Sequence, residues 1–229
     1  MALVPAAGQG VRLAAGMPKA FVPLLGRPLL WHCVQGLLAA GCVAQVVVAV
    51  GDEHRDRARS MLADAEQRVR IVVGAATRSG SVRCALDAVP NAEVVLVHDA
   101  ARCLAPVSVI RAVVDAVLDG EQAVVPVLPV VDTIKRVDAC GHVESTVDRS
   151  ALRTVQTPQG FAADLLRRAH QGSSGPVTDD AGLVERLGER VATVPGHPHA
   201  FKITTPFDLI IAEAVACARA ADVRPAGAP

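Results

Sequence analysis

The sequence contains no tyrosine, and its aromatic residues are limited to Trp31 and four phenylalanines. A core must therefore be built from aliphatic side chains; hydrophobic residues make up 51% of the 229 positions, enough for a sizeable core. The formal net charge is zero, with 23 lysines and arginines against 23 aspartates and glutamates. This balance argues against a general nucleic-acid binder, because such proteins are usually basic overall.

Cysteine pairs with zinc-ligand spacing are also missing. The six cysteines are scattered singly, which is typical of reduced structural thiols in the cytosol. The two histidines of GHPH (196–199) have no third ligand nearby in the sequence, so we do not interpret them as a metal site. No segment has the features of a signal peptide or a membrane span, and we expect a soluble cytoplasmic protein with no membrane partner.

Short valine-rich runs alternate with helical patterns along the first half of the chain. Strands are expected at 2–6, 45–50, 70–74, 93–100 and 122–130. Helices are expected between them at 29–41, 53–67, 81–89 and 106–120. This alternation predicts an α/β fold, Rossmann-like, with a mostly parallel sheet flanked by helices.

The pattern changes at residue 132. Two alternating runs, 132–137 and 142–147, are joined by a turn and predict a β-hairpin. An isolated hairpin is marginal in water, so we expect residues 132–150 to be a protruding arm that packs on something else, such as a second subunit. Helices at 162–170, 179–188 and 206–221 and a strand in RVATVPG follow. With no repeat and no linker, residues 1–229 are interpreted as one domain with an inserted arm.

A flexible, cationic loop follows the first strand. Residues 5–19, PAAGQGVRLAAGMPK, contain three glycines, Arg12 and Lys19, but no acid. In an open parallel sheet, ligands bind beyond the carboxyl ends of the strands. Glycine backbone amides and two cations at that edge predict a site for a phosphate chain.

Two common phosphate-binding motifs do not fit this loop. A Walker loop is excluded because Lys19 follows Pro18 rather than glycine. A dinucleotide fingerprint would need a third glycine where Leu13 stands, and an acid about 20 residues further on. A glycine loop carrying two solvated surface cations is the simpler alternative.

Further motifs occur in a fixed order after the loop. They are RSGSV (78–82), VLVHDAAR (95–102), DTIKRV (132–137), TVDR (146–149), TPQGF (157–161), TDDA (178–181) and KITTPFDL (202–209). With PAAGQGVRL…PKAF, they cover nearly the whole chain. With these motifs taken together, the sequence resembles the 2-C-methyl-D-erythritol 4-phosphate cytidylyltransferases of the non-mevalonate isoprenoid pathway, which are nucleotidyltransferases.

The resemblance implies a reaction and its partners. CTP and 2-C-methyl-D-erythritol 4-phosphate would give 4-diphosphocytidyl-2-C-methyl-D-erythritol and pyrophosphate, by in-line attack of the acceptor phosphate on the α-phosphate. It also implies Mg²⁺ as cofactor and a homodimer formed through the arm. The acceptor phosphate is already anionic, so the chemistry needs cations rather than a strong general base.

The resemblance also implies roles for individual residues. The implied catalytic cations are Arg12, Lys19 and Lys202. The implied nucleotide contacts are Pro5, Ala6, Ala7, Gly8, Gly10, Ala75, Arg78, Ser81, Asp99 and Ala100. The implied acceptor contacts are Asp99, Thr133, Arg149, Thr157 and Lys202. Asp99 is the candidate metal ligand, the nucleotide phosphates being the alternative source of ligands.

Taken alone, several of these residues have simpler interpretations. Arg149 and Lys202 would be ordinary surface cations, and Asp99 would cap the segment that follows it. His98 beside Asp99 suggests a dyad, but neighbouring strand residues point to opposite faces, so we expect a structural histidine.

The chain departs from the family pattern at three positions. Ala75 replaces the second glycine of a common pair, Cys103 follows DAAR where proline is usual, and Phe201 replaces an asparagine that commonly precedes the late lysine. The first departure bears on how cytosine is held. None of them removes a charged group that the chemistry needs.

Three other functions compete with this hypothesis. A cytidylyltransferase for another polyol phosphate, such as ribitol 5-phosphate, would use the same nucleotide site with a different acceptor. An NAD(P)-binding oxidoreductase would bind nicotinamide rather than CTP. A catalytically silent nucleotide-binding subunit would release no pyrophosphate.

Overall fold

The computed structural model describes residues 1–8, 17–172 and 177–222. Its centre is an eight-stranded sheet in the order β10-β7-β11-β6-β1-β4-β5, with β12 added beside β7. The first strands along the chain to join it are β1 (Ala2–Pro5), β4 (Val46–Val50), β5 (Val69–Val73) and β6 (Val94–Val97). These four pair in parallel, in the order β6-β1-β4-β5, as the valine-rich runs predict.

The other half of the sheet mixes directions. It contains β7 (Ala123–Pro129), β10 (Arg153–Val155), β11 (Gln159–Ala162) and β12 (Ala192–Pro195). β11 runs antiparallel to both β6 and β7, while β12 is parallel to β7. The predicted α/β fold with a mostly parallel sheet is confirmed, and the antiparallel strands β10 and β11 are additions that the sequence patterns did not indicate.

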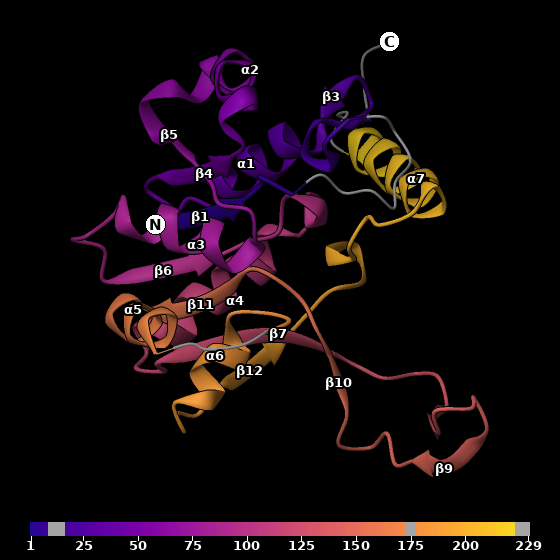
Figure 1. The fold of residues 1–229 in the computed structure, drawn as a ribbon. Helices are drawn as coiled ribbons and strands as arrows, with labels where there is room; N and C mark the ends of the chain where they lie inside the picture. The colour runs from indigo at the N-terminus through magenta and orange to yellow at the C-terminus, as the bar shows by residue number, and fades with distance from the viewer. Residues whose placement is uncertain (9–16, 173–176, 223–229) are drawn as a thin grey trace.

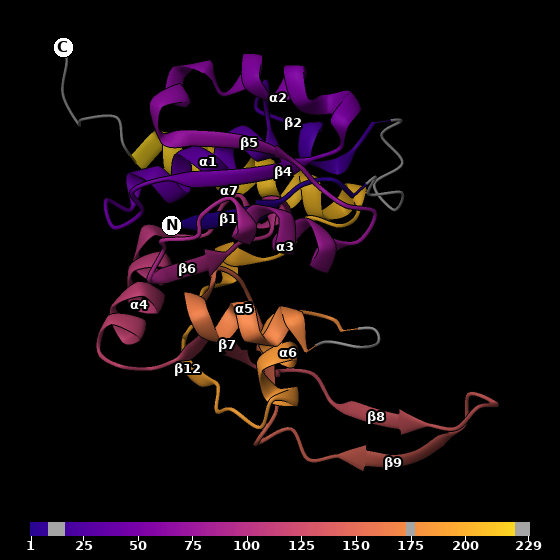
Figure 2. The same cartoon turned by 60° about the vertical axis from the view of Figure 1, so that its left-hand side comes forward.

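Helices cover both faces of the sheet (Figures 1 and 2). They are α1 (Leu29–Ala39), α2 (Arg55–Met61), α3 (Arg78–Asp87), α4 (Val107–Leu118), α5 (Ala163–Gln171), α6 (Ala181–Arg186) and α7 (Pro206–Asp222). One buried cluster joins α1, α4 and α7 to one face, and a second joins α3, α5 and α6 to the other. Among the described residues, no helix is both long enough and apolar enough to span a membrane.

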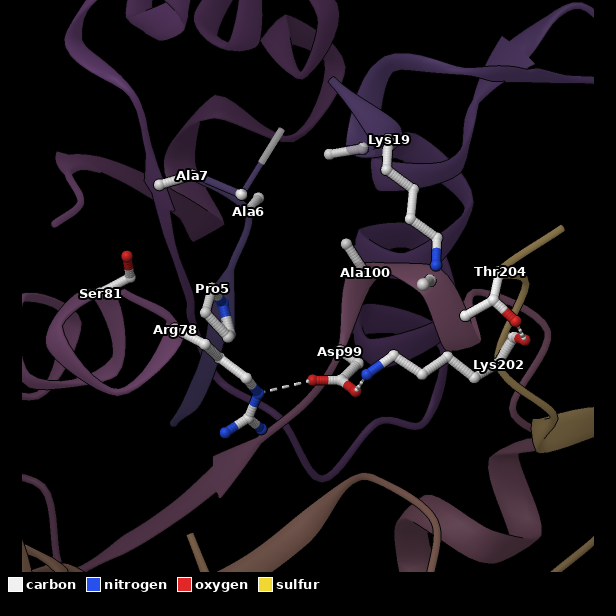
Figure 3. Close-up of a pocket in the computed structure, with 13 residues that line it drawn as sticks. Pro5, Ala6, Ala7, Lys19, Arg78, Ser81, Asp99, Ala100, Lys202 and Thr204 are labelled. Carbon is white, nitrogen blue, oxygen red and sulfur yellow. Dashed lines mark hydrogen bonds and ion pairs between the residues drawn. The ribbon is translucent and has the colours of Figure 1, made fainter. Parts of the chain in front are cut away.

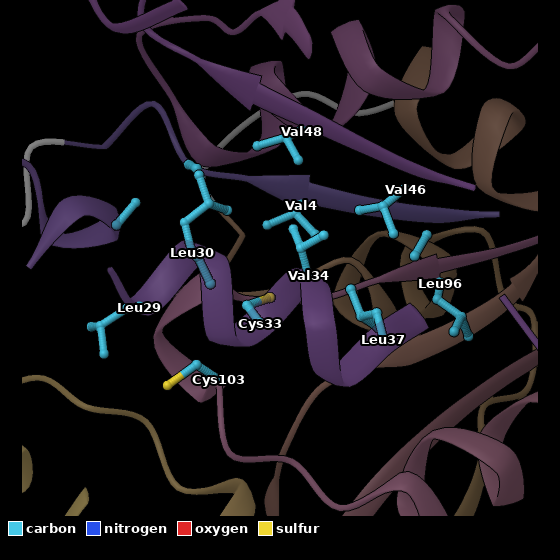
Figure 4. Packing of buried hydrophobic residues seen from close by; sticks show 14 of the residues in the cluster. Val4, Leu29, Leu30, Cys33, Val34, Leu37, Val46, Val48, Leu96 and Cys103 are labelled. Carbon is cyan, nitrogen blue, oxygen red and sulfur yellow. The ribbon is translucent and has the colours of Figure 1, made fainter. Parts of the chain in front are cut away.

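The division into two cores follows from side-chain alternation along the strands. Val4 of β1 packs toward α1, while its neighbour Leu3 belongs to the cluster on the opposite face. Figure 4 shows Leu30, Val34 and Leu37 of α1 beside the valines of β1 and β4. Leu30, Val34 and Leu37 are fully buried, and truncation of one such leucine to alanine typically costs about 2–5 kcal/mol.

The arm forms a separate two-stranded sheet of β8 (Ile134–Val137) and β9 (Val143–Val147). Asp138 closes its turn by accepting hydrogen bonds from the backbone N–H groups of Cys140 and His142, at 2.9 and 2.8 Å. The hairpin extends away from the body in both views (Figures 1 and 2). The pairing of β8 with β9 confirms the predicted hairpin. Val137 and Val143 are 55% and 61% exposed, so no other part of the described chain covers these two side chains.

Some predicted boundaries were wrong. The helix expected over 53–67 is interrupted: Asp52–His54 and Ala63–Arg68 are 3-10 segments on either side of α2. α2 ends at Met61, and the buried Leu62 that follows it, 2% exposed, takes non-helical dihedrals. α3 begins three residues before the expected start at Ser81, because the Thr77 side chain caps it by accepting from the N–H of Gly80. The strand expected to reach residue 100 stops at Val97.

Candidate active site

A cavity of about 220 Å³ opens where β1 and β6 end (Figure 3). The first loop contributes part of its lining, through Pro5, Ala6, Ala7 and Gly8. Later segments contribute Lys19, Arg78, Ser81, Asp99, Ala100 and Lys202. The structure therefore brings together ten of the residues predicted for the site, from segments distributed along the whole chain.

The loop after β1 enters the cavity directly from the strand. The N–H of Ala6 donates to the carbonyl of Ala49 at 2.7 Å, which extends the pairing with β4 just beyond Pro5. The predicted residues Gly10 and Arg12 lie outside the described residues. Lys19 begins a short 3-10 turn, Lys19–Phe21, whose Phe21 is buried in the core. In Figure 3 its ammonium points toward Ala100 and the side where Lys202 lies.

Ser81 lines the same cavity and fixes the turn before α3 through hydrogen bonds to backbone groups. Its hydroxyl lies 3.1 Å from the carbonyl of Ala75 and 2.9 Å from that of Thr77, and it accepts from the N–H of Ala75 at 3.1 Å. Glycine at position 74 allows this close packing, because a Cβ there would lie 2.8 Å from that of Ala7 and 2.9 Å from Ser81 Oγ. Ala75 does not line the cavity; it contributes through this backbone contact.

Asp99 follows β6, and two cations bind its carboxylate. Arg78 Nε donates to Oδ1 at 3.0 Å, and Lys202 Nζ lies 2.7 Å from Oδ2 (Figure 3). Burial alone would raise the pKa of the Asp99 carboxyl, but the charges of Arg78 and Lys202 outweigh it and hold that pKa well below its usual range. Asp99 is therefore an anion at neutral pH that gathers residues from α3 and the C-terminal region.

Lys202 is held in place by backbone contacts on both sides. The N–H of Ile203 donates to the carbonyl of Ala101 at 2.9 Å, and Arg102 Nη1 donates to that of Ala200 at 2.8 Å. Phe201 is half-buried and packs against the core cluster of α1. The departure at Phe201 thus supplies an apolar anchor beside the lysine, which fits the observed position of the side chain.

His98 has the structural role expected from its position. It is 2% exposed, and its Nδ1 lies 2.9 Å from the hydroxyl of Thr157. The same hydroxyl accepts from the N–H of Asp99 at 3.0 Å. Burial lowers the pKa of His98 to about 4, so the ring is neutral at pH 7. Thr157, predicted to contact the acceptor, thus also fixes the backbone that carries Asp99.

A second cavity of about 210 Å³ borders the same charged side chains. It shares Arg78, Asp99 and Lys202 with the first cavity, and Thr157 lines it as well. The three charged side chains therefore form the wall between two neighbouring cavities. This arrangement suits two anionic substrates that must be brought together.

The two predicted arm residues lie apart from both cavities. Thr133 and Arg149 are exposed and line neither one. The guanidinium of Arg149 donates to the carbonyl of Val131 at the base of the arm. Within one chain, the structure does not bring these two residues to the other predicted site residues.

Comparisons with known proteins agree with this geometry. The sequence model of the family described as "IspD: 2-C-methyl-D-erythritol 4-phosphate cytidylyltransferase" matches residues 1–217. The chain belongs to this family. It is accordingly a CTP-dependent nucleotidyltransferase that transfers a cytidylyl group to 2-C-methyl-D-erythritol 4-phosphate, and the other functions considered above are not favoured.

Individual relatives support the assignment over almost the full length. The 2-C-methyl-D-erythritol 4-phosphate cytidylyltransferase of Saccharopolyspora erythraea is 60% identical over 94% of this chain and 98% of its own. That of Nocardia farcinica is 57% identical over 96% and 95%. The crystal structure of the Thermus thermophilus enzyme matches with a TM-score of 0.77 at 39% identity, over 94% of this chain and 98% of its own.

Several site features were not among the predicted residues. Ala20, Ala101 and Thr204 also line the first cavity. Asp180, within the TDDA motif, forms an ion pair with Arg78 at 2.7 Å. The signal for Asp180 was an acid at the start of a predicted helix, but only the three-dimensional packing of α3 against α5 and α6 shows which cation it meets.

Proposed function

We propose that Lys19 and Lys202, together with Arg12 of the glycine-rich loop, supply the positive charge for cytidylyl transfer. The observation that carries this proposal is that Lys19, Lys202 and Asp99 line one cavity at the carboxyl ends of parallel strands. In that setting, the acceptor phosphate attacks the α-phosphate of CTP in line. A new phosphorus–oxygen bond forms, and pyrophosphate leaves with the electron pair of the bond that breaks.

The main barrier to this step is electrostatic. Two anions must approach each other, and negative charge builds on the α-phosphate as the new bond forms. Lysine ammonium groups aimed into the cavity offset that charge without a proton transfer. A phosphate monoester has a second pKa of about 6, so near pH 7 the acceptor is already a nucleophilic anion.

We assign the loop residues Pro5, Ala6, Ala7, Gly8 and Gly10 to the nucleotide, with Arg78, Ser81 and Ala100. Ser81 and Ala75 act on the base side by holding the turn before α3. On the acceptor side we place Asp99, Thr157 and Lys202, since they line the second cavity. Thr133 and Arg149 reach an acceptor from the partner subunit of a homodimer.

We also propose that the reaction uses Mg²⁺, and the residues of the site indicate which groups would bind it. The described part of the chain contains no group of three His, Cys, Asp or Glu side chains arranged to hold a metal ion. Asp99 is the one carboxylate among the described residues of the first cavity, and both of its oxygens face cations. A protein-built magnesium site does not fit these residues, so we assign the ligands of Mg²⁺ to the nucleotide phosphates and water.

A substrate panel tests the assignment. The purified protein is incubated with each of the four ribonucleoside triphosphates and with methylerythritol phosphate, ribitol 5-phosphate or glycerol 3-phosphate, with Mg²⁺ or EDTA. Pyrophosphate release and the product mass are measured. We expect turnover with CTP and methylerythritol phosphate, and loss of turnover in EDTA. Equal or better use of ribitol 5-phosphate would overturn the acceptor assignment.

Three further measurements address the remaining proposals. Calorimetry is expected to detect binding of CTP with Mg²⁺ and no binding of NAD. Light scattering is expected to give twice the 23.7 kDa mass of one chain. The six cysteines form no disulfide, which supports a reducing compartment. We therefore place the enzyme in the cytoplasm, and cell fractionation tests this.

A further inference from the structure

Asp180 is a completely buried acid that the roles assigned above do not use. It lies at the start of α6 and is 0% exposed. Its Oδ2 accepts a hydrogen bond from Arg78 Nη1 at 2.7 Å, and its Oδ1 lies 3.1 Å from His170 Nε2. A buried carboxylate is costly unless its oxygens are paired. Here both are paired, by side chains from two different helices.

The guanidinium of Arg78 is consequently held between two acids. Its Nε binds Asp99 and its Nη1 binds Asp180. Burial alone would lower the pKa of Arg78, but the two carboxylates outweigh it and raise that pKa above its ordinary value. Because a guanidinium is planar and rigid, two partners on different nitrogens fix the orientation of the whole group.

His170 contacts the second oxygen of Asp180 and so helps to hold this carboxylate in place. It is 7% exposed in α5, and its Nδ1 lies 3.5 Å from the hydroxyl of Ser79. Its Nε2 thus faces the Asp180 carboxylate while its Nδ1 faces the serine hydroxyl. A continuous series of contacts therefore runs from His170 through Asp180, Arg78 and Asp99 to Lys202.

The position of the Arg78 side chain matters because this residue lines both cavities. Asp99 and Lys202 also line both of them. Without Asp180, the guanidinium would keep a single carboxylate partner and would be free to rotate toward a substrate phosphate or to bind Asp99 through both edges. Either movement changes the wall across which the two substrates have to meet.

We propose that Asp180 is a positioning residue for the transfer step: it fixes Arg78 and, through it, the charged wall between the two cavities. This inference rests on the proposed function of those cavities. Small displacements of reacting groups cost large factors in rate. The expected effect of losing Asp180 is therefore on turnover more than on binding of CTP.

The test compares Asp180→Asn with wild type and with Asp164→Asn, which removes an exposed acid from the same region, on α5. We expect Asp180→Asn to lower kcat by at least about tenfold while the KM for CTP changes by less than about threefold. Asp164→Asn should leave both values unchanged. His170→Leu, which leaves Oδ1 without its donor, should give a smaller loss in the same direction, and it decides the question if Asp180→Asn does not fold.

A second readout does not depend on activity. The Nη1–H resonances of Arg78 report on its bond to Asp180 and are assigned by their loss in Arg78→Lys. We expect them to be dispersed and slowly exchanging in the wild type, and averaged in Asp180→Asn. An unchanged Arg78 resonance, or kcat values of both variants within about twofold of wild type, would overturn the positioning role. Absence of cytidylyl transfer in the wild type would instead overturn the proposed function, and the resonance would still decide the role of Asp180.

Discussion

Lys202 and Asp99 form an ion pair of 2.7 Å at the wall of the cavity. The two residues come from distant parts of the sequence, since Asp99 follows β6 and Lys202 lies in the C-terminal region. The lysine side chain is 40% exposed and the aspartate 11%. The cation thus remains accessible from the cavity while its partner is fixed in the protein. A polyphosphate entering the cavity meets an ammonium group that is already oriented, which is the preorganisation that electrostatic catalysis requires.

Replacing the cavity lysines tests this directly. We expect Lys19→Ala and Lys202→Ala each to reduce kcat by about 10²–10³, the range found when one group that stabilises transition-state charge is removed. The unfolding free energy should fall by about 1–3 kcal/mol for Lys202→Ala, because this variant leaves Oδ2 of the buried Asp99 without its ion-pair partner. Steady-state kinetics and thermal melts measure both quantities.

Arg59→Ala is the matched control for the lysine variants, since it removes an exposed cation from α2. Its activity and melting temperature should stay at the wild-type values. A lysine variant with nearly full turnover, or one that fails to fold, would contradict the assigned roles.

His98 makes stability depend on pH. Its pKa is about 4 in the folded protein, against about 6.5 when unfolded. Between these values the unfolded state binds the extra proton, so the contribution of His98 to stability is complete above pH 6.5 and is lost as the pH falls toward 4. This difference corresponds to up to about 3 kcal/mol.

The measurement is urea unfolding from about pH 7 to about pH 4.5, a range over which most of this contribution is lost. It is made for the wild type and for His98→Asn, whose amide takes the place of Nδ1 opposite Thr157. The variant is expected to be less stable at neutral pH and to lose less stability on acidification. Parallel curves for the two proteins would show that His98 does not carry the dependence.

Gly74 tests how tightly the nucleotide side of the cavity is packed. A methyl group there meets Ala7 Cβ at 2.8 Å and Ser81 Oγ at 2.9 Å, and neither atom is at the end of a flexible side chain. We expect Gly74→Ala to cost about 1–3 kcal/mol of stability and to raise the KM for CTP. Gly36→Ala is the control, because the nearest contact of its added methyl is 3.9 Å and helix propensity favours alanine there. Denaturant unfolding and kinetics distinguish the two variants.

The features that could be predicted from the sequence are those that local patterns determine. Valine runs specified β1, β4, β5 and β6, and the loop composition placed Lys19 at the site. The family resemblance, rather than local patterns, placed Asp99 and Lys202 there too. β11 escaped prediction because Gln159 and Gly160 have no strand pattern; they are buried by tertiary packing, with Gly160 close against Val113 of α4.

Partner choice among charged side chains could not be predicted in the same way. Arg78 pairs with Asp99 and with Asp180, which is 102 residues away in the sequence. Nothing in the local sequence of TDDA distinguishes Asp180, which is buried on Arg78, from Asp179, which accepts from Gln159 at 2.7 Å. Such pairings depend on how α3, α5 and α6 pack on the same face of the sheet.

The exposed arm leads to a test of subunit sharing. Thr133 and Arg149 line neither cavity of their own chain, so their predicted acceptor contacts require the arm to reach a partner subunit. If so, Lys19→Ala on one chain and Arg149→Ala on the other fall in the same site of a mixed dimer: one site carries both defects and the other carries neither. In an equal mixture, random exchange makes about half of the dimers mixed, so about a quarter of all sites are intact. We therefore expect activity to rise toward a quarter of wild type after exchange, measured by pyrophosphate release, while each variant alone stays nearly inactive. If exchange is verified with differently tagged subunits and activity does not rise, the arm does not complete the partner's site.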